Sequence, residues 1–433
     1  MHTTDDRTDL ERVLLGRVFV GSESPEAGSG REMEALVRSA GGNVVAEVSQ
    51  KRDAPDPRTF VGSGKVEEIR DTAHAMDVTT IVFDHNLSAG QVSKLEEVTN
   101  CKVIDRTELI LAIFALRART REAKLQIELA QLKYALPRLS GMWHHFSRLG
   151  AGIGTRGPGE TQLEIDRRRA RARITLLENK IEQVESRWQV ASARRKNIFK
   201  VSLVGYTNAG KSTLLNALCG QDIYTADKPF ATLDTTSRRM DLPDGSQVLL
   251  SDTVGFIERL PETLVASFHT TLDVARTADL LLVAVDRSDP ARGFHIEAVK
   301  RTLERIGVSE DTPRLTVWTK LDALQETAGP RTGIAVSAHT GLGMDELRTR
   351  IMQQRDFSLD WFRMELDYHD NEVLHWLYNN CVVKDVKDYD DGSAEVFAGA
   401  LRGYDSIKGK IDEALPVRDI QKLETPPAKS PGE

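Results

Sequence analysis

Residues 205–212 have the types and the spacing that bind phosphate. They read G-Y-T-N-A-G-K-S, which matches the phosphate-binding loop G-x-x-x-x-G-K-S. In such a loop, glycine lets backbone N–H groups turn toward the phosphates. Lys211 reaches the outer phosphates, and the Ser212 hydroxyl can ligate Mg²⁺. The pattern predicts a site for a nucleoside triphosphate; the alternative is a chance glycine loop.

The flanking residues bear on this choice. An apolar run over 198–204 is typical of a buried strand, and a helical pattern of Leu214, Leu215 and Leu218 follows the loop. A phosphate-binding loop needs a strand before it and a helix after it, so this context favours the phosphate site.

Two further segments predict a switch that depends on the nucleotide. The sequence Asp252-Thr253-Val254-Gly255 follows an apolar strand, and it supplies a carboxylate near the Mg²⁺ and an amide at Gly255 for the γ-phosphate. The sequence Phe230-Ala231-Thr232-Leu233-Asp234 lies between this segment and the loop. There, Thr232 can ligate the metal only while the γ-phosphate is present.

Two later segments indicate the base. Thr319-Lys320-Leu321-Asp322 follows a strand at 315–318, and Ser337-Ala338-His339 follows a strand at 334–336. The Asp322 carboxylate can accept from both the ring N–H and the amino group of guanine, whereas adenine would present a lone pair to it. Guanine is therefore favoured, and GTP is the expected substrate.

The whole chain has the composition of a globular protein. Its 433 residues favour roughly three domains. No apolar run approaches the roughly 18 to 20 residues that span a bilayer, and the polar N-terminus is unlike a signal peptide. Cys101, Cys219 and Cys381 lie far apart, as packed, reduced thiols do. We expect a cytoplasmic protein without stable membrane insertion, able to associate with ribosomes or peripherally with a membrane.

The net charge of −7 hides a basic middle. Residues 115–200 contain 19 Lys and Arg against 8 Asp and Glu, a local charge of +11 that leaves −18 on the remainder. Such a region favours a polyanion as partner, and the alternative is a solvated basic helix face.

The first hundred residues alternate short apolar runs with helical patterns, which predicts parallel strands joined by crossover helices. Gly62-Ser63-Gly64-Lys65 opens one of these helices and could hold an anion on its free amides. Because the segment lacks the spacing of either phosphate fingerprint, a plain tight turn is the favoured interpretation.

Two apolar seams at coiled-coil spacing predict a helical arm. Leu125, Leu129, Leu132 and Leu136 recur at helical spacing, and a second seam of Ile174, Leu177, Ile181, Val184 and Trp188 follows. Two such seams in one short segment most simply pack as an antiparallel helical hairpin.

The connection at 138–160 mixes cations with aromatic rings. It interleaves Arg138, Arg148 and Arg156 with Trp143, His144, His145 and Phe146, and an arginine cluster at 167–173 follows. This mixture suits phosphates and unpaired bases, so we expect structured RNA as its target. A mobile lid over the nucleotide site is the alternative.

Together these motifs resemble the HflX-type ribosome-associated GTPases of the Obg/HflX group. The resemblance is carried by G-Y-T-N-A-G-K-S, F-A-T-L-D, D-T-V-G-F and S-A, with G-P-G-E-T-Q-L-E-x-D-R-R at 157–168 as its most specific part. It covers nearly the whole chain. It implies hydrolysis of GTP to GDP and phosphate with Mg²⁺, binding to the large ribosomal subunit, and an arm directed at ribosomal RNA near the peptidyl transferase centre. It also implies a role in splitting or rescuing ribosomes under stress.

The resemblance also implies the site residues. The metal ligands would be Ser212 and Thr232, and the catalytic groups Lys211, Thr232 and Gly255. The nucleotide would be bound by Gly205, Tyr206, Thr207, Asn208, Ala209, Gly210, Lys211, Ser212, Phe230, Ala231, Thr232, Leu233, Asp234, Asp252, Thr253, Val254, Gly255, Thr319, Lys320, Leu321, Asp322, Ser337, Ala338 and His339.

One position departs from the family pattern, and another differs from many other switch GTPases. Thr319 stands where the base-reading motif normally begins with Asn. We therefore predict that some bracing of the loop is lost and that nucleotide affinity is weakened, with guanine preference retained through Asp322. Phe256 stands where many switch GTPases carry a glutamine that orients the attacking water. Intrinsic hydrolysis should therefore be slow.

Asn208 resembles the position that ligates K⁺ in some related GTPases, where the cation takes the place of an arginine finger. The alternative is that Asn208 only braces the loop.

The expected fold class is α/β, a P-loop GTPase domain with domains on either side. The divisions are an N-terminal α/β domain (1–106), a helical coiled-coil arm (107–197), the GTPase domain (198–355), a small α+β domain (356–424) and a disordered tail (425–433). We expect a monomer, because one GTPase domain with its own RNA arm needs no second copy.

Three functions remain open. The first is a GTPase that docks on the large ribosomal subunit and is released by hydrolysis. The second is a nucleotide-gated ribosome or RNA-binding factor in which hydrolysis is incidental. The third is an ATP-driven RNA remodeller with a second nucleotide site at 62–65, against which Asp322 argues.

Overall fold

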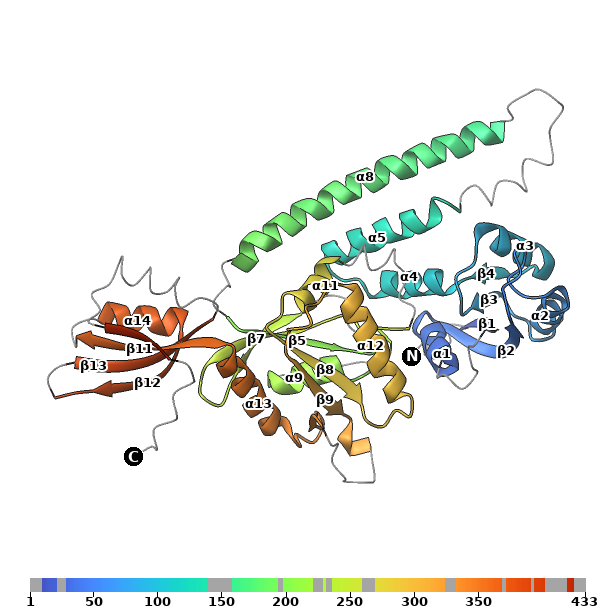
Figure 1. The fold of residues 1–433 in the computed structure, drawn as a ribbon. Coiled ribbons are helices and arrows are strands. Elements are labelled where there is room, and N and C mark those ends of the chain that lie inside the picture. The colour runs from blue at the N-terminus through green and yellow to red at the C-terminus, as the bar shows by residue number, and fades with distance from the viewer. Residues whose placement is uncertain are drawn as a thin grey trace, which may run out of the picture.

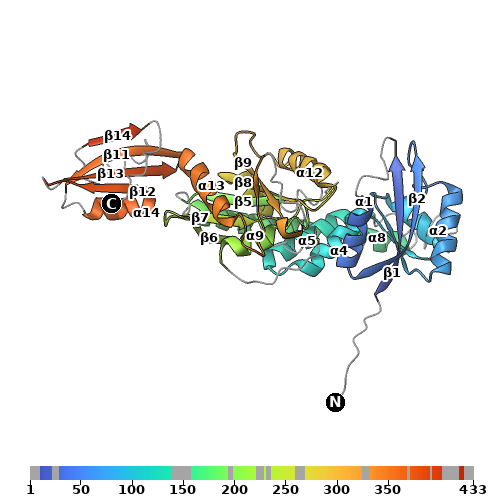
Figure 2. The same cartoon turned by 90° about the horizontal axis from the view of Figure 1, so that it is seen from below.

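Three sheets follow one another along the molecule, and a pair of long helices lies beside them (Figures 1 and 2). The computed structural model describes residues 10–21, 29–138, 158–193, 198–220, 229–230, 236–258, 269–323, 332–367, 371–390, 393–401 and 419–423. The expected α/β fold class is confirmed. Within these residues, no helix combines the length and the apolar character needed to cross a bilayer.

The N-terminal sheet is parallel, as the alternation of strand and helix patterns predicted. Its strands, in the spatial order β2-β1-β3-β4, are β1 (Glu11–Val20), β2 (Gly42–Arg52), β3 (Thr80–Phe83) and β4 (Lys102–Ile104). The helices between them are α1 (Ser29–Ser39), α2 (Ser63–Ala75) and α3 (Ala89–Thr99). Side chains of α2 and α3 share a core with one face of the sheet.

Helix α4 (Arg106–Arg117) joins the N-terminal sheet to the rest of the protein. It falls inside the range expected for the arm, yet Ile110, Ile113 and Phe114 are fully buried. They belong to one apolar core that also includes Met33 of α1 and Val204 of the GTPase domain. The N-terminal and GTPase domains are therefore packed through a shared core.

The central sheet has the order β10-β9-β8-β5-β7-β6, in which all neighbours are parallel except β6 and β7. The strands are β5 (Lys200–Gly205), β6 (Ser237–Asp241), β7 (Gln247–Asp252), β8 (Leu280–Asp286), β9 (Arg314–Thr319) and β10 (Ile334–Ala335). One face packs on α9 (Lys211–Leu218) and α13 (Met344–Phe357), and the other on α11 (His269–Arg276) and α12 (Arg292–Arg305).

The predicted helical hairpin is formed by α5 (Arg121–Ala135) and α8 (Pro158–Ala193), which lie side by side. Arg173 of α8 binds Glu128 of α5 through two hydrogen bonds of 2.6 and 2.9 Å, and Lys133 pairs with Glu178 at 2.8 Å. Leu177 is fully buried, whereas most of the described side chains of α8 are exposed. At 36 residues, α8 spans about 54 Å.

The C-terminal sheet is antiparallel and has the order β12-β13-β11-β14. Its elements are β11 (Leu359–Asp367), α14 (Asn371–Asn380), β12 (Val382–Asp388), β13 (Ser393–Leu401) and β14 (Asp419–Leu423). The predicted pairing of β12 with β13 is observed, and α14 packs on one face. Strand β14 was not expected from the sequence, and the tail at 425–433 lies outside the described residues.

Candidate functional site

The phosphate loop lies at the carboxyl end of β5, in the middle of the central sheet. Gly205 must be glycine, because a Cβ there would lie 2.4 Å from the carbonyl oxygen of Ala284. Gly210 has a φ of +80° directly before α9, so the backbone turns with the first N–H groups of that helix toward the loop. The predicted strand, loop and helix are thus observed.

Lys211 is held inside this loop. Its Nζ donates to the carbonyl oxygens of Tyr206 at 2.8 Å and Gly205 at 3.1 Å. Burial lowers the pKa of Lys211 to about 8, although the Asp252 carboxylate acts in the opposite direction. The ammonium is therefore presented in a poorly solvated place, where a phosphate would interact with it strongly.

Ser212, one of the two expected metal ligands, lies beside the carboxylate of Asp252. The Ser212 hydroxyl donates to Oδ2 of Asp252 at 2.6 Å, which brings the start of α9 to the end of β7. A hydroxyl and a carboxylate oxygen this close suit the oxygen-binding Mg²⁺, so the residues present fit that ion. Thr232, the second expected ligand, lies outside the described residues, as do Ala231, Leu233 and Asp234.

The base-binding segments meet at the ends of β9 and β10. Lys320 pairs with Asp286 at 2.8 Å, and the Ser337 hydroxyl donates to Asp322 at 2.6 Å. That hydrogen bond holds the pKa of the Asp322 carboxyl below its ordinary value and orients it as an acceptor. A cavity of about 330 Å³ lies here, lined by Asn208, Gly210, Thr213, Leu214, Thr319, Lys320, Asp322, Ala323, Val336, Ala338 and His339.

Thr319 still contributes bracing to the phosphate loop, where the sequence predicts that some bracing is lost. Its hydroxyl lies 2.8 Å from the carbonyl oxygen of Ala209 and 3.1 Å from that of Val285. The shorter side chain still reaches the phosphate loop because Thr319, the last residue of β9, lies next to Ala209. However, a hydroxyl has one proton to donate. Because the Thr319 hydroxyl donates its proton to a backbone carbonyl oxygen, it cannot also donate a hydrogen bond to the base.

The switch segments begin close to the phosphate loop. The N–H of Phe230 donates to the Thr207 hydroxyl at 3.1 Å. At the other segment, a Cβ on Gly255 would lie 2.8 Å from Cα of Thr207 and 3.1 Å from Nζ of Lys211. Only glycine permits this approach, which brings the Gly255 backbone to where the outer phosphate would meet Lys211.

Phe256 is buried away from this point. Its side chain is 1 % exposed and lies in the core that the two domains share. An apolar ring in this position cannot orient a water molecule, which agrees with the sequence-based interpretation.

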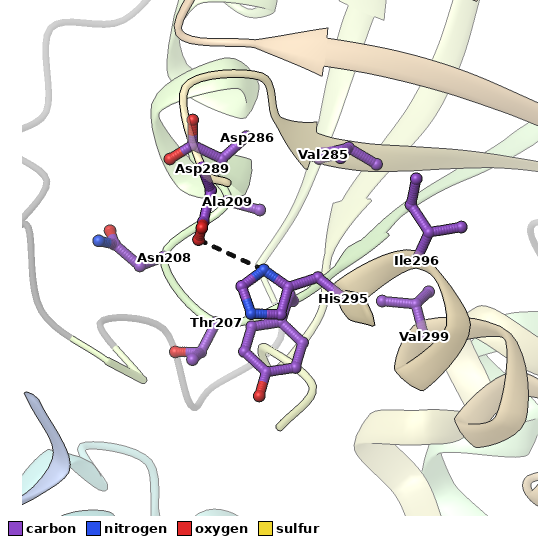
Figure 3. A pocket seen from close by; sticks show the side chains of 11 residues that line it. Thr207, Asn208, Ala209, Val285, Asp286, Asp289, His295, Ile296 and Val299 are labelled. Atoms are coloured by element: carbon purple, nitrogen blue, oxygen red, sulfur yellow. Dashed lines mark ion pairs between the residues drawn. The ribbon is translucent and has the colours of Figure 1, made fainter. Parts of the chain in front are cut away.

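Asn208 has a φ of +62°, a conformation that Asn tolerates better than most residues. Among the described residues its side chain makes no hydrogen bond, so no bracing contact is found for it. Figure 3 shows the smaller cavity behind the loop, with Asn208 pointing away from His295 and the His295–Asp289 pair dashed.

Arg138, assigned from the sequence to the RNA-binding connection, has a structural partner instead. Its guanidinium donates to Asp105 at 2.7 Å and to the carbonyl oxygen of Leu87 at 2.6 Å, and it lies over the Tyr134 ring. Asp105 is completely buried, so Arg138 neutralises its charge and anchors the end of α5.

Comparison with known proteins covers the chain from residue 28 to 402. Four family models match in sequence order: GTP-binding GTPase N-terminal (28–115), GTP-binding GTPase Middle Region (117–195), 50S ribosome-binding GTPase (200–320) and HflX C-terminal domain (322–402). The GTPase HflX of Alkalihalophilus pseudofirmus is 40% identical over 413 residues, which are 94% of this chain and 97% of that protein. The chain belongs to the HflX family of GTPases.

A further relative supports the assignment to the HflX family. The GTPase HflX of Escherichia coli (strain K12) is 45% identical over 354 residues, covering 79% of this chain and 82% of that protein. Among solved structures, a GTP-binding protein of Sulfolobus solfataricus in complex with GDP is 24% identical and covers 78% of this chain and 98% of that chain, with a TM-score of 0.42. As an HflX-family GTPase, the protein binds and hydrolyses GTP, in a family that generally uses Mg²⁺.

Residues that belong to none of the sequence motifs contact the phosphate loop from outside it. Glu32 and Arg106, both in the N-terminal domain, form a buried ion pair that reaches Tyr206 and Glu258. His295 of α12 stacks on the Tyr206 ring. These HflX residues form no local motif, because their partners lie far away along the chain.

Proposed function

We propose that this HflX-family GTPase docks on the large ribosomal subunit in its GTP form, splits or rescues ribosomes, and is released by hydrolysis. The supporting observation is the exposed basic surface of α8. Arg168, Arg169 and Arg171 all face solvent there, on a helix that lies beside the sheets rather than inside a core. A row of solvated cations on a rigid helix suits the phosphates of ribosomal RNA.

The nucleotide site would gate this docking. Lys211 and the amide of Gly255 would contact the phosphates, Ser212 and Thr232 would hold Mg²⁺, and Asp322 would select guanine. The 2.6 Å contact between Ser212 and Asp252 supports the metal position. K⁺ beside Asn208 would supply positive charge during hydrolysis; equal turnover in sodium and in potassium would refute that role.

The decisive experiment measures GTP turnover with and without purified large ribosomal subunits. One variant replaces residues 139–157 with a Gly-Ser linker, which keeps Arg138 in place. A second carries Arg168→Gln, Arg169→Gln and Arg171→Gln. The matched control carries Lys300→Gln, Arg301→Gln and Arg305→Gln, an equal charge loss on exposed α12 residues. Stimulation by subunits should persist in the control and disappear in both arm variants.

A second candidate function follows from Phe256, a buried apolar residue at the position where many switch GTPases have a glutamine that orients the attacking water. In that case the nucleotide only gates ribosome or RNA binding, and hydrolysis is incidental. Subunit binding that requires GTP while turnover remains unstimulated would favour this function over the first.

A further inference from the structure

A buried ion pair from the N-terminal domain lies at its boundary with the GTPase domain. Glu32 of α1 pairs with Arg106 of α4, and their side chains are 8% and 4% exposed. Two buried charges are costly unless further hydrogen bonds satisfy them. Here those hydrogen bonds go to the GTPase domain.

The pair closes a ring of hydrogen bonds around Glu258. Arg106 donates to the carbonyl oxygen of Glu258 at 2.8 Å. The N–H of Glu258 donates to Oη of Tyr206 at 3.1 Å, and the Tyr206 hydroxyl donates to Glu32. Both backbone groups of Glu258 are thus held by the Glu32–Arg106 pair, one directly and one through the phosphate loop.

The backbone between Gly255 and Glu258 is bound to the phosphate loop. Phe256 donates from its N–H to the carbonyl oxygen of Gly205 at 3.0 Å and accepts from the N–H of Thr207 at 2.7 Å. These bonds and the ring lie directly after Gly255, whose backbone approaches Lys211. Movement of Glu258 would therefore shift the amide that meets the γ-phosphate.

Tyr206 is held from its other side as well. The His295 ring stacks on it with 3.8 Å between centroids and 14° between planes. His295 in turn contacts Asp289 at 3.4 Å, as Figure 3 shows. The Tyr206 hydroxyl therefore has little freedom to leave Glu32 and Glu258.

We propose that Glu32 and Arg106 are positioning residues for GTP hydrolysis, contributed by the N-terminal domain. They act through Tyr206 and Glu258 to hold the Gly255 amide over Lys211. A transition-state contact is effective only when its donor is already in place, so a loosened Gly255 would slow hydrolysis. GDP has no γ-phosphate, and its affinity should depend little on this ring.

Two variants of the full-length protein test the proposal. Tyr206→Phe removes only the hydroxyl and keeps the ring that stacks on His295, and Glu32→Gln removes the charge that Arg106 and Tyr206 bind. The single-turnover rate of bound GTP should fall by about 10- to 100-fold in each. The dissociation constant of GDP should change by less than about twofold, since it reports on binding without the γ-phosphate.

Glu47→Gln is the matched control, because it breaks an ion pair with Arg17 inside the N-terminal sheet. It should leave both the rate and the GDP affinity unchanged. An unchanged or faster rate in Tyr206→Phe would overturn the proposal, as would a loss of GDP affinity in proportion to the rate. If Glu32→Gln does not fold, the rate and GDP affinity of Tyr206→Phe still test the proposal.

Discussion

The ring of Phe114 meets the ring of Phe230 edge-on, with 4.6 Å between the centroids and 86° between the planes. Phe114 belongs to α4, and Phe230 begins the segment that carries Thr232. Both side chains are buried, and both belong to the core that the two domains share. The N-terminal part of the protein therefore contacts one switch segment at Phe230 and, at Glu258, the backbone that follows the other.

Phe114→Ala should destabilise the protein by about 3–5 kcal/mol, because it leaves a cavity between the domains. Urea unfolding measures this loss. Phe357→Ala is the matched control, since Phe357 is 75% exposed whereas Phe114 is 1% exposed. The control should change stability by less than about 0.5 kcal/mol. Equal losses in both variants would contradict a shared core at Phe114.

Thr319→Asn should tighten GTP binding by about 3- to 10-fold, because an amide can brace Ala209 and still offer an N–H to the base. Equilibrium binding of GTP, ATP and xanthosine triphosphate checks this. Both proteins should prefer GTP, since Ser337 keeps Asp322 oriented. If ATP binds as tightly as GTP, Asp322 does not select the base.

Arg138→Ala should lower the free energy of unfolding by about 3–5 kcal/mol, because it leaves the Asp105 carboxylate buried without its counter-charge. Arg171→Ala removes the same charge from an exposed place on α8 and should change stability by less than about 0.5 kcal/mol. Thermal unfolding compares the two. If Arg138→Ala keeps full stability, Arg138 is not a structural partner of Asp105, and its assignment to the RNA-binding connection would stand.

Acidification should destabilise the protein through His295. Burial lowers the pKa of His295, although Asp289, Glu32 and Asp286 act in the opposite direction. The unfolded chain, with a His pKa of about 6.5, then binds the proton more tightly, so stability falls as the pH drops through and below that value. His295→Gln should show a shallower fall in urea unfolding between pH 7.5 and 5. An identical slope would contradict this assignment.

The sequence alone was sufficient to predict the strand, turn and helix of the phosphate-binding loop. Gly205, Gly210 and Lys211 are neighbours in the chain, and their function depends on the local turn of one strand into one helix. The alternation of apolar runs likewise predicted the parallel strands of the N-terminal sheet. The contact of Thr319 was less predictable, because whether its shorter hydroxyl reaches the Ala209 carbonyl oxygen depends on where β9 ends in space.

Partners far apart in the chain could not be predicted in this way. Tyr206 and Glu32 are 174 residues apart, and Glu258 and Arg106 are 152 apart. The residue types of α4 do not show which surface buries Ile110, Ile113 and Phe114. That depends on how two folded sheets pack together, and this packing brings the N-terminal domain against Phe230 and Glu258.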